Sequence, residues 1–434
     1  MKKVAFYTLG CKVNTYDTEA LAEIFEKSGY QVVDFEELSD VYVINTCTVT
    51  NLGDRKSRQM IRRAKKTNEN AVIVVAGCYA QTASDEVIEI PEVNLVIGNK
   101  DRKKIVEWVE EIQRNKKQKI NAVGNIMQEV DFEELSVFEM KGKTRAFIKV
   151  QEGCNQFCSY CIIPYARGPI RSRRPQSILE EIEKLVALDY KEIVLTGIHV
   201  ASYGKDLKNI TLIDLIQQIH QIEDVKRIRL SSLEPTLLTM DFLDSLSKLP
   251  KFCPHFHISL QSGSDTTLKA MKRKYTTTQY KQYVDNVRHY FKDASITTDI
   301  MVGFPGEGEK EFEETYNFAK EIGFSKIHVF KYSPREGTPA AQYPNQVNGE
   351  IKEERSKRLI KLASTMEKNY YQRFVVSKRE ILFEQEDSRR KHYFEGLTDN
   401  YIRVFVPSKE DIKGQIKSVL LKDVKEESME GYII

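Results

Sequence analysis

The sequence contains no run of apolar residues long enough to span a bilayer. Its first residues, MKKVAFY, also lack the extended apolar core and the small-residue cleavage site of a secretory signal peptide. We therefore expect the protein to be cytoplasmic. In that reducing compartment, the seven cysteines of the chain favour metal ligands or redox thiols over disulfides.

A large excess of one charge is also missing. The chain has 66 Lys and Arg residues against 63 Asp and Glu residues, for a formal net charge of +3. This balance does not indicate nucleic-acid binding by itself, so a basic surface has to come from local clusters. With 434 residues, 41% of them hydrophobic and 30% charged, the chain has the composition of a globular protein of two or three domains.

The most informative pattern is a C-x3-C-x2-C run formed by Cys154, Cys158 and Cys161. Disulfides need an even number of cysteines, and a structural zinc site or a closed iron–sulfur cluster usually takes four protein ligands. Three thiolates on one tight loop can hold three corners of a four-iron cluster and leave the fourth iron open to a ligand. The alternatives are a zinc site completed by a distant residue and three unrelated buried thiols.

Residues 1–125 alternate strand-like and helix-like patterns, which predicts a small, doubly wound, parallel α/β domain. The strands are expected at residues 3–9, 41–45 and 72–76, and the helices after Tyr16, Arg55 and Asp101. Just past each strand lies one cysteine: Cys11, Cys47 and Cys78. Because open parallel sheets bind ligands at the carboxyl ends of their strands, the three thiols could converge in one crevice. They could also be three buried small hydrophobic residues.

Within an expected domain of residues 140–370, a strand–helix pattern repeats six times from Thr144 to about Pro339, which predicts an open, partial (βα)6 barrel. The strands are expected at residues 145–150, 192–196, 227–231, 256–260, 296–302 and 326–332. A polar or glycine-bearing loop follows each strand, where barrel enzymes place their chemistry. The clearest helix is expected to begin at Ser177, with Glu180 completing a capping box.

The tail, residues 371–434, follows a helical linker at about 350–372 and alternates polar and apolar residues. This pattern predicts a small five-stranded β-barrel. Phe383, Tyr393 and Tyr401 in the tail are candidates for stacking on bases. The seventh cysteine, Cys253, lies between Phe252 and Pro254 and is predicted to be a buried residue that binds no metal.

Six cysteines in two sets of three, on this architecture, resemble the radical S-adenosylmethionine (SAM) methylthiotransferases. The segments that carry the resemblance are residues 9–14 (LGCKVN), 44–50 (INTCTVT), 76–78 (AGC), 152–161 (EGCNQFCSYC), 164–168 (PYARG) and 171–173 (RSR). That family combines an N-terminal cluster-binding domain, a radical SAM domain and a C-terminal TRAM domain with an OB-like barrel. Lys12-Val13 and Thr48-Val49-Thr50 resemble the branch that modifies N6-threonylcarbamoyladenosine at position 37 of tRNA.

The resemblance implies that the hydrogen on carbon 2 of the adenine ring is replaced by a methylthio group. One 4Fe-4S cluster would be held by Cys154, Cys158 and Cys161, and its open iron would bind SAM for radical chemistry. A second 4Fe-4S cluster, with an open iron for the inserted sulfur, would be held by the N-terminal set: Cys11, Cys47 and Cys78. Further SAM contacts are expected in the cysteine loop and at strand ends: Tyr160, Thr196, Gly197, Glu234, Gln261 and Gly303.

Basic residues are concentrated in two segments. Arg55, Arg58 and Arg62 are spaced by three and four residues, which places them on one helix face. A second group follows the cysteine loop: Arg167, Arg171, Arg173 and Arg174. Both adjoin predicted cluster loops, where an RNA backbone would have to pass, although a run of charge is often only a solvated face. Arg167 and Arg171 are also candidates for pairing with the threonyl carboxylate.

The expected partners are the anticodon loop of tRNA and an electron donor such as a flavodoxin-like reductant, and the chain is expected to be a monomer. Rival hypotheses keep the chemistry but change the substrate to isopentenyladenosine in tRNA or to a ribosomal-protein aspartate. A rival of another class is a non-enzymatic iron–sulfur protein that binds RNA or senses redox state. A zinc-stabilised scaffold is the remaining alternative.

Overall fold

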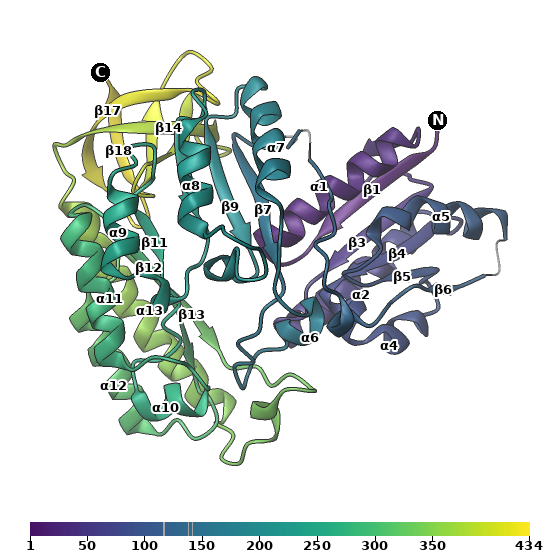
Figure 1. Cartoon of the computed structure of the whole chain (residues 1–434), viewed down its shortest axis with the longest axis horizontal. Coiled ribbons are helices and arrows are strands. Elements are labelled where there is room, and N and C mark those ends of the chain that lie inside the picture. Colours follow the sequence, from purple (N-terminus) through teal and green to yellow (C-terminus); the bar gives the residue numbers. More distant parts are fainter. Residues whose placement is uncertain (116–117, 138, 141) are drawn as a thin grey trace.

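The computed structural model describes residues 1–115, 118–137, 139–140 and 142–434. It contains three successive parts, each built on its own sheet system (Figure 1). None of the helices in these ranges combines the length and the apolar character that crossing a membrane would require.

The first part is a parallel six-stranded sheet with the strand order β2-β1-β3-β4-β5-β6. Its strands are β1 (Lys3–Thr8), β2 (Gln31–Val33), β3 (Val41–Thr46), β4 (Val72–Gly77), β5 (Leu95–Ile97) and β6 (Ile120–Asn121). Every residue of β3 and β4 is buried, because both faces of the sheet are covered and the strands are continuous apolar runs. The predicted doubly wound domain is confirmed, and the short strands β2, β5 and β6 are additional to the prediction.

Helices cover both faces of this sheet. They are α1 (Lys12–Lys27), α2 (Asn51–Thr67), α3 (Cys78–Thr82), α4 (Ser84–Ile88), η1 (Arg102–Lys104) and α5 (Ile105–Arg114). Leu21 and Phe25 of α1 share one apolar cluster with Val109 of α5, whereas Ile61 of α2 packs into a second cluster with Val87 of α4. The two clusters are the two faces of the sheet.

The central part is an open partial barrel of six parallel strands, as predicted. They are β7 (Arg145–Glu152), β9 (Glu192–Gly197), β10 (Arg227–Leu230), β11 (His255–His257), β12 (Ser295–Val302) and β13 (Lys326–Lys331). Isolated parallel bridges, such as the one between Leu233 and Ile258, join the β7–β10 sheet to the β11–β13 sheet. A short antiparallel strand, β8 (Arg171–Ser172), pairs with the end of β7.

The helices of the central part lie on the outside of the strands, and a single apolar core fills the space between (Figure 1). They are α6 (Ile163–Arg167), α7 (Pro175–Ala187), α8 (Leu212–Gln221), α9 (Met240–Ser247), α10 (Asp265–Ala270), α11 (Thr277–Tyr290), α12 (Glu309–Ile322) and α13 (Gly349–Gln372). Short 3-10 turns complete the connections: η2 (Ile126–Gln128), η3 (Val200–Ser202), η4 (Pro235–Leu237) and η5 (Pro339–Gln342).

The expected start of α7 is wrong. The helix begins at Pro175, whose ring fixes a helical φ, and it has no side-chain N-cap. The hydroxyl of Ser177 instead donates to Glu134 at 2.8 Å and accepts from the Arg173 guanidinium at 3.1 Å. Ser177 is therefore a partner in a polar network and not a cap.

The tail forms a closed five-stranded barrel with the order β14-β15-β16-β18-β17, which confirms the predicted shape. Its strands are β14 (Lys378–Glu386), β15 (Tyr393–Thr398), β16 (Arg403–Pro407), β17 (Ile416–Val424) and β18 (Met429–Ile433). Phe383 is fully buried in the core of this barrel, so it cannot stack on a base. The barrel docks on the amino-terminal ends of β9 and β10, where Arg229 donates to the carbonyl of Asp399 at 2.9 Å.

Candidate active site

The three N-terminal cysteines lie at the same edge of the first sheet. Cys11 is the N-cap of α1, Cys47 directly follows β3, and Cys78 begins α3 after β4. The Cys47 thiol lies within electrostatic reach of Cys11 and Cys78. Gly10 has a φ of +105°, and a Cβ there would come within 2.9 Å of the Cys47 Cβ and 3.1 Å of its Sγ. The glycine therefore allows the first two loops to close on each other, and the structure brings the three thiols together.

The second cysteine set sits on the loop after β7. Gly153 adopts a φ of +73°, and a Cβ at this position would lie 1.8 Å from the carbonyl oxygen of Pro169. Only glycine fits this turn. The Cys154 amide donates to the Gly168 carbonyl at 3.0 Å, and the Cys161 amide donates to the Cys158 carbonyl at 3.0 Å. These bonds curl the loop so that its three thiols lie within electrostatic reach of one another.

Burial controls the charge of these thiols. It raises the pKa of Cys47 and of Cys154 to about 11 and that of Cys161 to about 12. The thiolate is the form that binds a metal, and burial disfavours this charged form. Metal binding at either set therefore has to supply the free energy that removes the thiol protons.

Two arginines are aimed at the sulfur atoms. Nε of Arg167 donates to Sγ of Cys78 at 3.2 Å, and Nη1 of Arg273 donates to Sγ of Cys158 at 3.4 Å. Charge-assisted donors of this kind stabilise a thiolate and orient it. Three thiols together with such a donor fit an open iron–sulfur cluster at both places.

The spacing of the thiols bears on the zinc alternative. In the described part of the chain, no three His, Cys, Asp or Glu side chains converge closely enough to hold one metal ion. A four-iron core binds each thiolate at a different iron, so its ligands lie farther apart than those of a single zinc ion. Among the described residues, neither cysteine set therefore forms a site for a single zinc ion as it stands.

Glu234, a predicted SAM contact, is already engaged by neighbours. Nη2 of Arg273 donates to its two carboxylate oxygens at 3.0 and 2.9 Å, and Nε2 of His199 lies 3.8 Å from it. Burial alone would raise the pKa of Glu234, but His199 and Arg273 lower it, so the carboxylate is held ionised. Arg273 thus joins Cys158 to Glu234. Sequence reasoning missed it, because an arginine between Lys272 and Lys274 has the pattern of a solvated surface.

Two other predicted SAM contacts, Gln261 and Gly303, have left-handed backbones at strand ends. Gln261 has a φ of +69° and exchanges backbone hydrogen bonds of 2.9 Å with Asp299 and Met301 of β12. Gly303 has a φ of +73°, and its amide donates to the Glu307 carboxylate at 2.7 Å. A bulky polar residue in this conformation is uncommon, and such strain is concentrated at functional sites.

The remaining predicted contacts lie on the same rim. Thr196 and Gly197 end β9, and a Cβ at Gly197 would meet Gln151 of β7 at 3.0 Å. Tyr160 packs edge-on against Phe304 with the ring centroids 6.5 Å apart. The cysteine loop and the turn after β12 therefore share an apolar floor.

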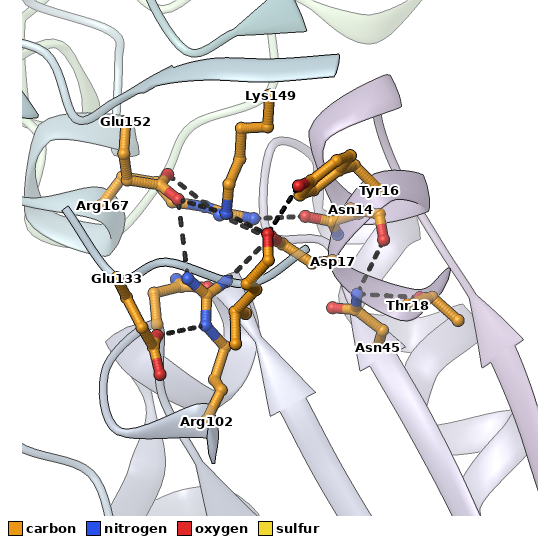
Figure 2. Close-up of polar contacts among 12 residues, drawn as sticks. Asn14, Tyr16, Asp17, Thr18, Asn45, Arg102, Glu133, Lys149, Glu152 and Arg167 are labelled. Carbon is orange, nitrogen blue, oxygen red and sulfur yellow. Dashed lines mark hydrogen bonds and ion pairs between the residues drawn. The ribbon is translucent and has the colours of Figure 1, made fainter. Parts of the chain in front are cut away.

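A buried network of charges joins the first sheet domain to the partial barrel (Figure 2). Asp17 of α1 pairs with Arg102 at 2.9 Å, with Lys149 at 2.5 Å and with Arg167 at 2.9 Å. Glu152 pairs with Lys149 at 3.1 Å and with Arg167 at 3.0 Å. Burial alone would raise the pKa of Glu152, but Arg167 and Lys149 lower it to about 2. With Glu133 bound to Arg102 at 2.8 Å, three cations face three carboxylates.

Three of the arginines expected to contact RNA are buried. Arg167 and Arg173 have no exposed surface and Arg171 is 2% exposed. Arg173 pairs with Glu181 at 2.5 Å, and Arg171 donates to the carbonyls of Pro169 and Arg167 at 3.0 Å. The predicted RNA contacts at Arg167, Arg171 and Arg173 are therefore wrong, as is the pairing of Arg167 and Arg171 with a substrate carboxylate. Their partners are carboxylates and carbonyls of this chain.

The basic face of α2 is exposed, as expected for a charged helix beside a ligand site. Arg55 and Arg62 are exposed, whereas Arg58 is half-buried and donates to the Tyr79 hydroxyl at 2.8 Å. The helix begins just after Cys47, and its N-cap Thr50 accepts from the Gly53 amide. Arg174 is exposed as well. Of the predicted RNA contacts, Arg55, Arg62 and Arg174 therefore remain available to a polyanion, and Arg55 lies in the first turns of the helix that follows Cys47. The seventh cysteine, Cys253, is buried.

Two family models match the chain. Residues 3–98 match the family described as uncharacterized protein family UPF0004, and residues 148–319 match the radical SAM superfamily. The first match lies within the first sheet domain and the second within the partial barrel.

Curated relatives cover nearly the whole chain. It is 46% identical over 422 residues to the threonylcarbamoyladenosine tRNA methylthiotransferase MtaB of Bacillus subtilis, covering 96% of this chain and 93% of that one. It is 39% identical over 402 residues to the protein of the same name from Aquifex aeolicus, covering 93% and 96%. It is also 36% identical over 441 residues to the tRNA-2-methylthio-N(6)-dimethylallyladenosine synthase of Dictyoglomus thermophilum, covering 100% and 99%.

A solved structure shares the fold. The radical SAM methyltransferase TsrM from Kitasatospora setae, with cobalamin and a 4Fe-4S cluster bound, superposes with a TM-score of 0.59 at 14% identity. The match covers 78% of this chain and 77% of that one. At this identity the likeness concerns the fold alone.

Proposed function

Because this chain belongs to the radical SAM tRNA methylthiotransferases, we propose that it methylthiolates carbon 2 of N6-threonylcarbamoyladenosine at position 37 of tRNA. The observation that carries the proposal is an arginine contact that links the helix after one cysteine set to a cysteine of the other set. Arg167 lies on α6, just after the Cys154–Cys161 loop, and its guanidinium donates to Cys78 of the other set. A reaction that joins SAM chemistry to sulfur insertion needs two adjoining sites, and this contact supports such an arrangement.

Membership of the radical SAM superfamily implies SAM and one 4Fe-4S cluster. When bound, they supply radical chemistry, which the carbon 2 hydrogen requires because it is neither acidic nor activated. Cys154, Cys158 and Cys161 are the ligands that we propose for this cluster. Arg273 orients Cys158, and it holds Glu234 as a carboxylate that can accept a hydrogen bond from the amino group of SAM.

A second 4Fe-4S cluster at Cys11, Cys47 and Cys78 is part of the proposal. With three thiolate ligands, it keeps one iron free for the inserted sulfur. Tyr160, Thr196, Gly197, Gln261 and Gly303 are the further SAM contacts that we propose, since all lie on the loop rim of the partial barrel.

The tRNA is proposed to lie across the exposed basic face of α2, with Arg55 and Arg62 against its backbone and Arg174 nearby. Residues 1–125 would act as the sulfur-donor domain, 140–370 as the radical SAM domain and 371–434 as an RNA-binding TRAM domain. An electron donor such as a flavodoxin-like protein would reduce the enzyme, which would act as a monomer.

The test is anaerobic reconstitution followed by assays on three substrates. These are tRNA carrying threonylcarbamoyladenosine, tRNA carrying isopentenyladenosine, and a ribosomal-protein peptide with an aspartate. Mass analysis should find the methylthio group only on threonylcarbamoyladenosine, and the iron count should be about eight per chain, from two four-iron clusters. Product on either of the other substrates alone, or iron without SAM cleavage, would refute the proposal.

A further inference from the structure

A polar cavity of about 580 Å³ lies where the three parts of the chain meet. The first domain contributes Lys12, the partial barrel contributes Arg145, His257 and Asp299, and the C-terminal barrel contributes Glu384 and Tyr401. None of the proposed cluster ligands or SAM contacts lines it. It nevertheless adjoins the backbone of the N-terminal set, because Lys12 follows Cys11 directly in the sequence.

Three of the four lysine and arginine side chains that line this cavity pair with a carboxylate. Arg145 pairs with Glu384 at 2.5 Å, Lys326 with Glu367 at 3.1 Å, and Arg403 with Glu395 at 2.6 Å. The ammonium of Lys12 has no hydrogen bond or ion pair with any residue in the described ranges. It lies 5.9 Å from the ring of Phe147. The cavity therefore contains one cation that lacks an anion.

Tyr401 stands opposite this cation and is held in a strained position. Its φ of +69° is an outlier for a bulky residue. Its amide donates to the Thr398 carbonyl at 3.1 Å, and its ring stacks on His255 at 4.2 Å. The preceding residue, Asn400, is fully buried and donates to the hydroxyl of Tyr370 at 3.1 Å. The C-terminal barrel thus fixes the Tyr401 side chain in the wall of the cavity.

The chemistry of adenine connects the cavity to the reaction. Carbon 2 and carbon 6 both flank N1, so a substituent on N6 lies along the same edge of the ring as the carbon that gains sulfur. A base whose carbon 2 faces the Cys11 site must therefore direct its N6 substituent toward residues close to Cys11. Lys12 is the first of these.

We propose that this cavity binds the carboxylate-bearing substituent on N6 of the substrate, with the Lys12 ammonium as its ion-pair partner and the Tyr401 hydroxyl as a second contact. This inference depends on the proposed function and specifies what selects its substrate. A hydrocarbon substituent would leave the Lys12 ammonium buried against it without an anion, which costs binding free energy. The carboxylate removes that cost, so Lys12 discriminates between the two kinds of tRNA.

The test removes the charge from each partner in turn. The probes are anticodon stem-loop RNAs that carry threonylcarbamoyladenosine, its threonyl methyl ester, or dimethylallyladenosine, and binding to the reconstituted holoenzyme is measured by fluorescence anisotropy. The unmodified enzyme should bind the free acid about tenfold or more tightly than the ester. K12Q should abolish this preference while binding the ester as before, and K12R should retain it.

K143Q is the matched control. Lys143 has the same charge and lies over the same Phe147 ring at 5.6 Å, but it pairs with Glu19 at 3.1 Å and does not line the cavity. Its replacement should leave the preference for the acid unchanged. Iron content of each variant shows whether the neighbouring cluster site is intact.

The outcomes separate this inference from the proposed function. Equal binding of acid and ester by the unmodified enzyme overturns the inference, even if threonylcarbamoyladenosine is still methylthiolated. Equal weakening of acid and ester by K12Q also overturns it, because Lys12 would then contact the RNA backbone or support the fold. Preference for the acid without any methylthiolated product supports the cavity and refutes the proposed function.

Discussion

Replacing Asp17 by Asn should destabilise the attachment of the first domain to the partial barrel. Asp17 is 3% exposed and pairs with all three cations of the buried network, at 2.9, 2.5 and 2.9 Å, whereas the nearest Arg102–Glu152 distance is 3.8 Å. The three cations Arg102, Lys149 and Arg167 balance Asp17, Glu133 and Glu152, so the variant leaves one buried positive charge without compensation (Figure 2). Breaking a buried pair in this way costs about 3–5 kcal/mol.

Urea unfolding of the anaerobically purified protein measures this cost. The chain has a single tryptophan, Trp108, which packs on the core of the first domain and reports its unfolding by fluorescence. With a urea dependence of about 1–3 kcal/mol per molar, the loss predicts a midpoint lowered by at least about 1 M. Midpoints of the same Trp108 transition are compared, because a chain of several domains does not unfold in one step.

Glu36→Gln is the matched control. Glu36 also pairs with an arginine of the first domain, Arg63 at 2.5 Å, but the two side chains are 59% and 51% exposed. An exposed pair contributes less than about 1 kcal/mol, so its midpoint should scarcely move. Adding Lys149→Met to Asp17→Asn removes the excess cation and should recover part of the loss. Equal midpoints for Asp17→Asn and Glu36→Gln, or a further loss in the double variant, would refute the charge-balance argument.

Three further predictions concern the barrel, the cysteine loop and the basic helix. Burial alone would raise the pKa of Glu192, but the guanidinium groups of Arg229, Arg145 and Arg227 lower it to about 2, so its contribution to stability is complete above about pH 4.5 and is lost toward pH 2. The melting temperature of the unmodified protein should therefore fall more steeply from pH 5 to pH 3 than that of Glu192→Gln. Gly153→Ala should lower the iron count by about four, because its Cβ would meet a carbonyl at 1.8 Å; retention of all iron would contradict this. Arg55→Gln combined with Arg62→Gln should weaken tRNA binding and reduce the slope of log Kd against log salt by about one to two, whereas an unchanged slope would remove α2 from the RNA interface.

The strands and the placement of the cysteines were predictable because they depend on local patterns. Continuous apolar runs at β3 and β4 specify strands that are buried on both faces, and the residues that follow them necessarily reach one edge of the sheet. Left-handed glycines such as Gly153 reinforce the turn after β7. Local chemistry of this kind is read directly from the sequence.

The fate of the arginines was not predictable in this way. An arginine has the same sequence pattern whether it faces solvent or a buried carboxylate. Asp17, which pairs with Arg167, is 150 residues away along the chain, and only the docking of the first domain on the barrel brings the two together. Glu181, which pairs with Arg173, lies on the following helix α7, but nothing in the local pattern shows that Arg173 turns toward it. Arg273 was missed for the same reason, since its partners Cys158 and Glu234 lie on other strands' loops.

The buried network also restricts how a substrate reaches the site. Separating the first domain from the partial barrel would break the pairs that cross between them, which are those of Asp17 with Lys149 and Arg167 and that of Arg102 with Glu152. The contact between Arg167 and Cys78 would be lost in the same movement. These crossing pairs stabilise the docking of the first domain on the barrel. The cavity that opens between Lys12, Asp299 and Tyr401 is bordered by all three parts of the chain and requires no such separation. The proposed contact between Lys12 and the N6 substituent can therefore form while the first domain stays docked on the barrel.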